Sequence, residues 1–357
     1  LNNTTTSNQI NADYIKIMID NNEPVTLSNL DNNIIASDLT LNPEESKIIS
    51  IRVWLDINTP NTEIGKVFSS KITSNGVGSE YIESKLAADV ILNIYNDATK
   101  TQVVNNSVTY NYAKEVNMME DIGKNVRYYG TNPNNYVLFN DELWRIIGVF
   151  KDIDDGTGNK QQRLKIIRDE NIGEYEWDSN NKNEWPNATL NVYLNGEYLN
   201  SLTSEAVSMI DNALWNLGGS SDYQDMYAND YYTYERGTTV YSGHSTSWTG
   251  KIALMYSSDY MYAGDLSKCN LDGYNWNDDT INCRDTSWLK NTNSIQWTLT
   301  NYSSNAFGVF NVFDTGIVDY YIVFDLGETR PVLYLKHNVQ ITSGDGSSTN
   351  PYILSLE

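Results

Sequence analysis

Residues 222–234 concentrate side chains that could recognise a ligand. Tyrosine rings stack on sugar faces or anchor a protein partner, and carboxylates accept hydrogen bonds from sugar hydroxyl groups. The alternative is a loop whose tyrosines pack against their own domain. Asp222 and Asp225 supply carboxylates in this segment. The candidate ligand-binding residues are Tyr223, Tyr227, Asp230, Tyr231, Tyr232 and Tyr234, together with Trp248 and Trp276 from two other loops.

A second segment, residues 152–159, is rich in the oxygen atoms that calcium prefers. It reads Asp-Ile-Asp-Asp-Gly-Thr-Gly-Asn, so that Asp152 and Asp154 are candidate ligands. The segment lacks the downstream glutamate that an EF-hand loop requires at its last position. The alternative is a long hairpin connection, in which the Asp-Gly pair suits the turn geometry.

Asn277 and Asp278 are the other candidate calcium ligands. With Trp276 they form the Trp-Asn-Asp tripeptide that calcium-dependent C-type lectins carry shortly before a cysteine. Cys283 comes several residues later than in those lectins, and their partner tripeptide, Glu-Pro-Asn or Gln-Pro-Asp, does not occur in the sequence. The alternative is a polar loop closed by a disulfide. We therefore expect no cofactor and leave calcium open.

Cys269 and Cys283 are the two cysteines of the chain, and they flank a polar loop that has little means of holding its own shape. A disulfide that closes a loop of this size contributes about 3 kcal/mol by constraining the unfolded chain. The spacing predicts a disulfide in an exported protein, against the alternative of reduced thiols in a cytosolic one.

The residue types needed for catalysis are scarce. His244 and His337 are the two histidines, and neither lies in a metal-ligand motif. The sequence has no Gly-x-Ser-x-Gly elbow, and paired cysteines leave no thiolate. A carboxylate pair acting on a glycoside stays open, because 46 acidic residues ensure that some pairs lie close together. The sequence predicts a protein that is not an enzyme.

The formal net charge of the 357 residues is −22. Such a chain repels nucleic-acid phosphates and anionic lipid headgroups, which argues against nucleic-acid and membrane-surface binding. No segment reaches the roughly 18 apolar residues of a membrane span. The first residues, Leu-Asn-Asn-Thr-Thr-Thr, resemble a linker, so we expect an upstream signal or anchor that was removed. These features predict an extracellular or cell-surface location.

The pattern over residues 10–112 is that of an all-β domain. Strands are expected at 14–19, 47–55 and 88–95, with turn signals between them, and a helix is possible at 79–88. Short, regularly spaced strands favour a β-sandwich. Residues 113–130 are expected to be a linker, so the predicted domains are 1–115, a sandwich, and 116–357.

The second domain is predicted to be strand-rich with one or two helices and long loops. A hairpin is expected about Asn140-Asp141, followed by a strand at 163–168. Helices are expected at 188–198, with Asn187 as N-cap, and at 204–210, with Thr203 as cap. A strand at 251–255 precedes the cysteine loop. The fold class is therefore β-rich α+β.

Two resemblances accompany these patterns. Residues 41–46, 51–56 and 61–68 resemble the small β-sandwich domains of surface and fibre-forming proteins of Gram-positive gut bacteria. Residues 144–150, 185–195, 251–260, 288–289, 296–299, 330–335 and 341–352 resemble a family of uncharacterised exported domains of Firmicutes and related bacteria. That family shares a C-type-lectin-like fold, distantly like that of formylglycine-generating enzymes, and the resemblance implies no established activity.

Three functions follow as hypotheses. The first is a non-catalytic adhesion protein, in which a sandwich stalk displays a lectin-like domain to an extracellular glycan or protein. The second is a structural pilus-like or fibre subunit, which an unpaired edge strand in the N-terminal domain would favour. The third is a glycan-active enzyme, which requires two carboxylates facing each other across a deep cleft.

Overall fold

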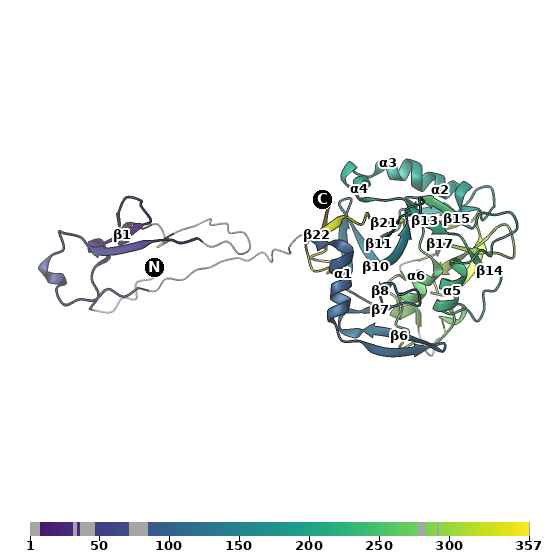
Figure 1. Cartoon of the computed structure of the whole chain (residues 1–357), viewed down its shortest axis with the longest axis horizontal. Helices are drawn as coiled ribbons and strands as arrows, with labels where there is room; N and C mark the ends of the chain where they lie inside the picture. Colours follow the sequence, from purple (N-terminus) through teal and green to yellow (C-terminus); the bar gives the residue numbers. More distant parts are fainter. Residues whose placement is uncertain are drawn as a thin grey trace. The chain divides into compact units, whose positions relative to one another are not determined.

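The computed structural model in Figure 1 describes residues 8–30, 34–35, 47–70, 85–277, 283–290 and 293–356. The chain divides into a smaller unit, Leu1–Tyr81, and a larger unit, Ile82–Glu357. The boundary thus lies well before residue 115, where the sequence pattern placed it. Segments 41–46 and 79–84 and residue Asp278, which carried expectations above, lie outside the described residues.

The described part of the smaller unit is a three-stranded antiparallel sheet of order β2-β1-β3. Strand β1 (Ile15–Ile19) pairs with β2 (Val25–Thr26) on one side and with β3 (Ile51–Leu55) on the other. Successive side chains of β1 point to opposite faces of the sheet, so Ile15 and Ile17 are buried on one face. Lys16, on the other face, forms an ion pair with Asp56 at 3.3 Å. The predicted strand at 14–19 is therefore confirmed, whereas the strand predicted at 47–55 is present over its last five residues, Ile51–Leu55. Three short 3₁₀ turns complete the described elements: Ala12–Tyr14, Leu27–Asn29 and Asn61–Glu63.

The larger unit begins with a helix where a strand was expected. Helix α1 spans Ala87–Asp97 and buries Ala87, Ala88, Ile91 and Tyr95. These residues recur every three to four positions, which is the period of one helix face and not of a strand. The expected strand at 88–95 is therefore wrong, and so is the all-β pattern proposed for residues 10–112.

The main sheet of the larger unit has twelve strands among the described residues, with a central path β4-β22-β23-β9-β10-β8-β7-β6-β5. Strand β23 lies between β22, with which it is antiparallel, and β9, with which it is parallel. Strands β11, β21 and β16 extend the sheet from β10. Its strands are β4 (Lys85–Leu86), β5 (Thr101–Asn105), β6 (Val108–Ala113), β7 (Met118–Glu120), β8 (Val126–Tyr128), β9 (Tyr136–Phe139), β10 (Glu142–Asp154), β11 (Lys160–Arg168), β16 (Ile252–Ala253), β21 (Val332–Tyr334), β22 (Val339–Ser343) and β23 (Tyr352–Leu356).

Residues 113–130 are part of this sheet and not a linker. Strands β7 and β8 lie in them, and Met118, Met119 and Val126 are buried. The hairpin predicted about Asn140-Asp141 is confirmed, because it joins β9 to β10 and both residues have positive φ. Consecutive positive φ values are those of a type I′ turn.

A second sheet of six strands and a two-stranded ribbon carry much of the remaining chain. The six strands are β12 (Glu174–Glu176), β14 (Gly219–Ser220), β17 (Ile295–Tyr302), β18 (Gly308–Phe313), β19 (Val318–Ile322) and β20 (Leu326–Glu328). The ribbon pairs β13 (Ala213–Asn216) with β15 (Ser247–Gly250). The fold is therefore β-rich α+β, as predicted.

Helices of the larger unit are short. A continuous helical stretch contains α2 (Thr189–Tyr193), a π turn (Leu194–Tyr198) and α3 (Leu199–Ser201). Its N-cap is Ala188 rather than Asn187, which lies in the preceding 3₁₀ turn Trp185–Asn187. Helix α4 (Ser204–Met209) has the predicted Thr203 cap, whose hydroxyl accepts a hydrogen bond from Ala206 N at 3.2 Å. Helices α5 (Ala228–Glu235) and α6 (Ser257–Tyr262) follow, with 3₁₀ turns at Lys114–Val116, Gly273–Asn275 and Cys283–Thr286.

Candidate functional site

The predicted tyrosine segment contains helix α5, which divides its residues between surface and core. Asp230 caps the helix, since its Oδ2 accepts a hydrogen bond from Tyr227 N at 2.9 Å. Tyr231 is fully buried and packs edge-on against Phe310, with ring centroids 5.4 Å apart. Tyr231 therefore belongs to the core, and its place among the ligand-binding residues is corrected.

A surface hollow of about 510 Å³ lies beside the N-terminal half of α5. Asp230 and Tyr234 line it from one face of the helix, being four residues apart. Tyr234 is 43% exposed, the most accessible ring of the segment. We call this the tyrosine hollow; its lining residues are Ser221, Asp222, Tyr223, Gln224, Asp225, Met226, Asp230 and Tyr234.

An aromatic cluster holds one wall of the tyrosine hollow. Tyr223 packs edge-on against Tyr274 and Tyr320, with centroids 5.5 Å and 5.4 Å apart. Tyr320 in turn stacks on Tyr302 at 3.9 Å. These contacts fix the ring of Tyr223, so a ligand that binds against it does not have to order it first. Tyr227 is half-buried outside the lining, and burial, with Asp272 and Asp225 nearby, raises the pKa of its hydroxyl.

The two predicted tryptophans do not reach the tyrosine hollow. Trp276 is fully buried, and its indole nitrogen donates to the carbonyl of Leu271 at 3.0 Å. Its prediction as a ligand contact is therefore wrong. Trp248 is half-buried on β15 and lies edge-on to Trp185, with centroids 6.1 Å apart. The single contact surface expected from Tyr223–Tyr234, Trp248 and Trp276 does not form.

Two of the predicted calcium ligands, Asp154 and Asn277, accept hydrogen bonds from other parts of the described structure. Asp154 Oδ1 accepts the amides of Gly156 and Gly158, at 2.8 Å and 2.9 Å, as a turn residue does. Asn277 Oδ1 accepts a hydrogen bond from the guanidinium of Arg284. No group of three or more histidine, cysteine or acidic residues among those described could hold a metal ion. Asp152 lines a different cavity, described below.

The predicted disulfide is present. Cys269 and Cys283 are joined, with their Cα atoms 5.3 Å apart, and both are buried. The buried amide of Asn105, at the end of β5, donates to the carbonyls of Leu266 and Cys269 at 3.2 Å and 2.7 Å. The disulfide and this amide therefore attach the cysteine segment to the main sheet.

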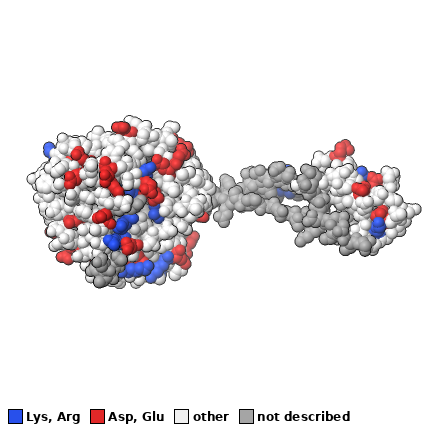
Figure 2. All heavy atoms as spheres, turned by 180° about the vertical axis from the view of Figure 1, so that it is seen from behind, with Lys and Arg blue, Asp and Glu red and all other residues white. Residues whose placement is uncertain are grey.

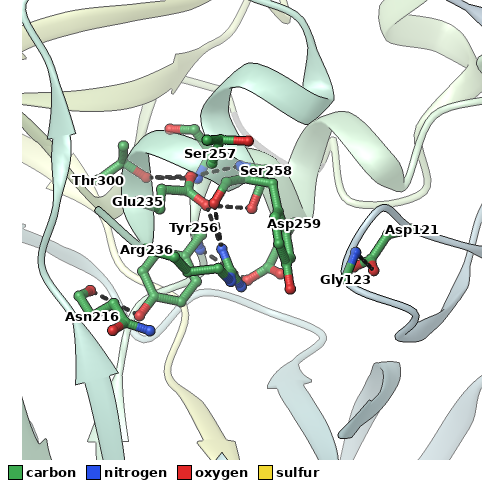
Figure 3. A network of polar contacts seen from close by, with 12 residues as sticks. Asp121, Gly123, Asn216, Glu235, Arg236, Tyr256, Ser257, Ser258, Asp259 and Thr300 are labelled. Carbon is green, nitrogen blue, oxygen red and sulfur yellow. Dashed lines mark hydrogen bonds and ion pairs between the residues drawn. The ribbon is translucent and has the colours of Figure 1, made fainter. Parts of the chain in front are cut away.

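A cluster of buried charges lies between the main sheet and helix α6, and Figure 3 shows part of it. Asp259, at the start of α6, accepts hydrogen bonds from Arg127 Nη1 at 2.6 Å and from Lys165 Nζ. Arg127 Nε also donates to Asp121 Oδ2 at 2.5 Å. All four side chains are at most 1% exposed. We call these four residues the ion cluster.

The ionisation of the cluster follows from burial and pairing. Burial alone would raise the pKa of Asp259, but Lys165 and Arg127 outweigh it and hold that pKa well below its usual range. For Lys165 burial dominates and lowers the pKa to about 8, against the opposing effect of Asp259. Aromatic rings surround Lys165, the nearest being Tyr256, whose centroid is 4.5 Å from Nζ. The lysine is therefore sealed from solvent.

A second buried acid, Glu235, links the C-terminus of α5 to the N-terminus of α6. Its Oε1 accepts hydrogen bonds from Ser258 N at 2.9 Å and Thr300 Oγ1 at 2.8 Å. Its Oε2 accepts from the Ser258 hydroxyl and from Arg236 Nη1, the latter at 3.1 Å. Burial raises the pKa of Glu235. Figure 3 shows these groups converging on one carboxylate, so Glu235 fixes how the two helices meet.

Sequence reasoning missed both sets of charges. The available signal was a charged residue inside an apolar run, as at Lys165 between Leu164 and Ile166. Strand β11 is buried on both faces, so a cation there must have a buried counter-ion. The sequence could not identify Asp259 as that counter-ion, because it lies 94 positions further along the chain.

No helix among the described residues is long and apolar enough to cross a membrane. Figure 2 shows acidic side chains spread over the drawn face of the larger unit, with basic ones gathered in fewer places. No family model matches this chain, and neither does any curated protein or solved structure.

Proposed function

We propose that the chain is a non-catalytic, extracellular binding protein that recognises a glycan through the tyrosine hollow. The observation that carries the proposal is the composition of that hollow, in which Tyr223 and Tyr234 stand beside Asp222 and Asp225. Exposed rings offer apolar faces to sugar C–H groups, and the carboxylates accept sugar hydroxyl hydrogens. The disulfide is compatible with an oxidising exterior.

The same hollow gives little support to a glycoside hydrolase. Both oxygens of Asp230 are occupied, since Oδ2 accepts from Tyr227 N and Oδ1 accepts from Asn229 Nδ2 at 2.9 Å. A carboxylate whose two oxygens both accept hydrogen bonds within its own helix is poorly placed to act on a glycosidic bond.

We expect Tyr234→Ala to weaken glycan binding by about five- to thirtyfold, the range for an aromatic contact residue. The measurement is a glycan array, followed by titration of the best ligand, with and without chelator. Tyr241→Ala is the matched control, because Tyr241 is 37% exposed and lies outside the tyrosine hollow. Uniform binding across the array, or equal losses in both variants, would contradict the proposal. The chelator arm decides whether calcium takes part.

A second proposal, that the smaller unit mediates assembly, rests on strand β3. Val53, Trp54 and Leu55 are 42%, 40% and 50% exposed, so that β3 shows apolar side chains on both faces. Among the described strands β3 pairs with β1 along one edge, and its other edge has no partner. Exposed apolar strands of this kind pair readily with another chain.

We expect the protein to self-associate with rising concentration and Trp54→Lys to reduce this association at least tenfold, because a charge on β3 opposes edge pairing. Light scattering after size-exclusion chromatography measures the self-association of the wild type and of the variant. Val104→Lys is the control, since Val104 is a 68% exposed strand residue of the larger unit. A wild-type chain that stays monomeric at all concentrations would exclude the assembly function.

A further inference from the structure

A second cavity, of about 190 Å³, lies on the other side of helix α5 from the tyrosine hollow. Tyr232 and Arg236 line it, whereas Asp230 and Tyr234 line the hollow. Positions two residues apart on a helix point in nearly opposite directions, so the two cavities are separated by the helix itself. We call the second cavity the arginine pocket.

Arg236 lines this pocket, and two of its three guanidinium nitrogens have no partner among the described residues. Its guanidinium lies 3.5 Å from the ring centroid of Tyr232, and its side chain is 22% exposed. Nη1 donates to the Tyr232 carbonyl at 3.2 Å and to Glu235 at 3.1 Å. Nε and Nη2 have no hydrogen-bond partner within the described part of the chain. These two nitrogens form the edge of the guanidinium that binds carboxylates through two parallel hydrogen bonds.

A bulge in strand β10 brings a second cation to the mouth of the pocket. The pairing of β10 with β11 shifts register between Phe150 and Ile153, which leaves Lys151 and Asp152 unpaired. Asp152 has φ of 55°, a left-handed conformation that costs a non-glycine residue about 1 kcal/mol. The side chain of Asn125 stabilises the bulge, since its Oδ1 accepts from Lys151 N at 3.0 Å. Bulges of this kind commonly redirect side chains toward sites.

The lining of the pocket carries two cations and one carboxylate. Arg236 and Lys151 are cations, and the ammonium of Lys151 has no ion-pair partner among the described residues; Asp152 is the one carboxylate in the lining. The amide side chain of Asn216 is also without a described partner and adds hydrogen-bonding capacity. Behind the wall, Arg127 and Lys165 are matched by Asp121 and Asp259, and Glu235 pairs with Nη1 of Arg236. An anion is therefore favoured by the free donors of Arg236 and Lys151 and not by a net positive charge.

We propose that the arginine pocket binds the oxyanion of an acidic sugar residue, a carboxylate or a sulfate, on the free edge of Arg236. Lys151 supplies a second positive charge, and the hydroxyl-bearing rings of Tyr256 and Tyr334 form the wall. This site is independent of the tyrosine hollow and extends the proposed glycan recognition to charged residues. The net charge of −22 gives an anion no long-range attraction, so its affinity must come from these local contacts.

The test compares methyl β-glucuronide, methyl β-glucoside and glucose 6-sulfate by NMR titration of the full chain. We expect the glucuronide to bind at least tenfold more tightly than the glucoside, the effect of one charge-assisted pair. Comparable binding of the sulfate supports recognition of either oxyanion, whereas binding of the glucuronide alone assigns the pocket to carboxylates. Equal affinity for the glucuronide and the glucoside overturns the proposal.

Two variants locate the binding. Arg236→Gln is expected to lower glucuronide affinity at least tenfold and Lys151→Ala about threefold, because a rim charge contributes less. Lys151 lies on the surface, so its variant keeps the test valid if loss of Arg236 disturbs folding. Lys124→Ala is the control, since that lysine is 66% exposed outside the pocket. Tyr234→Ala should leave glucuronide affinity unchanged, which separates this site from the tyrosine hollow. Wild-type affinity in Lys151→Ala and Arg236→Gln overturns the assignment.

Discussion

Asp259→Ala is expected to lower the free energy of unfolding of the larger unit by about 3–5 kcal/mol. The substitution leaves Arg127 and Lys165 buried without the carboxylate that both contact. The two cations then repel each other in a region from which water is excluded. Chemical denaturation followed by tryptophan fluorescence measures the change, and an unaltered slope would show that the folded state keeps its compactness.

Two further variants separate the charge from other effects at this position. Asp259 also caps α6, because its Oδ2 accepts from Tyr256 N at 2.9 Å. Asp259→Asn keeps an acceptor for that cap and removes the charge, so it should retain most of the destabilisation. Asp285→Ala breaks the pair with Arg284 at the surface, where Asp285 is 56% exposed, and should cost at most about 1 kcal/mol. A loss below 1 kcal/mol in Asp259→Ala would contradict the account.

The ion cluster also sets how stability responds to acid. The pKa of Asp259 is lower in the folded chain than its unfolded value near 4, so its contribution is fully present above about pH 4. That contribution is lost as the pH falls toward the folded value, because the unfolded chain takes up the proton first. Asp259→Asn should therefore flatten the acid limb of the stability curve relative to wild type.

Removing the disulfide is expected to destabilise the larger unit by about 3 kcal/mol. The double variant Cys269→Ala/Cys283→Ala frees a segment whose cysteines are 14 positions apart. The cost arises in the unfolded chain, which regains the conformations that the cross-link excluded. For a unit of this size the melting temperature should fall by roughly 6–12 °C.

The control for this prediction is to add a thiol reductant to the wild type and to the double variant. Reductant should lower the melting temperature of the wild type to that of the double variant and leave the variant unchanged. The contacts of Asn105 with this segment should hold it in place at lower temperature, so the spectrum of the folded state should change little. Two titratable thiols in the untreated folded protein would show that the disulfide does not form.

Structural elements that depend on neighbouring residues could be predicted from the sequence, whereas contacts between distant residues could not. The Asn140-Asp141 hairpin, strand β11 and the Thr203 cap of α4 depend on neighbouring residues, and the structure contains each of them. Helix α1 was not predicted because its apolar residues, including Ile91 and Ile94, are of types common in strands, although their spacing has the period of a helix.

The candidate site was predicted in part. Tyr223, Asp230 and Tyr234 do line one hollow, because they are close in sequence and one helix carries two of them. Tyr231 and Trp276 were misplaced, since an aromatic residue in a polar segment gives no sign of which way its ring turns. The arginine pocket joins residues of three separate strands, β10, β13 and β21, with α5, a combination that only the tertiary fold creates.

The position of strand β23 has a consequence for biogenesis. Residues 352–356 lie inside the main sheet, between β22 and β9. Strands β9 and β10 come much earlier in the chain, so they are synthesised first. During translation the main sheet therefore cannot be joined between β22 and β9 until β23 has emerged, so this part of the sheet forms late in the synthesis of the chain.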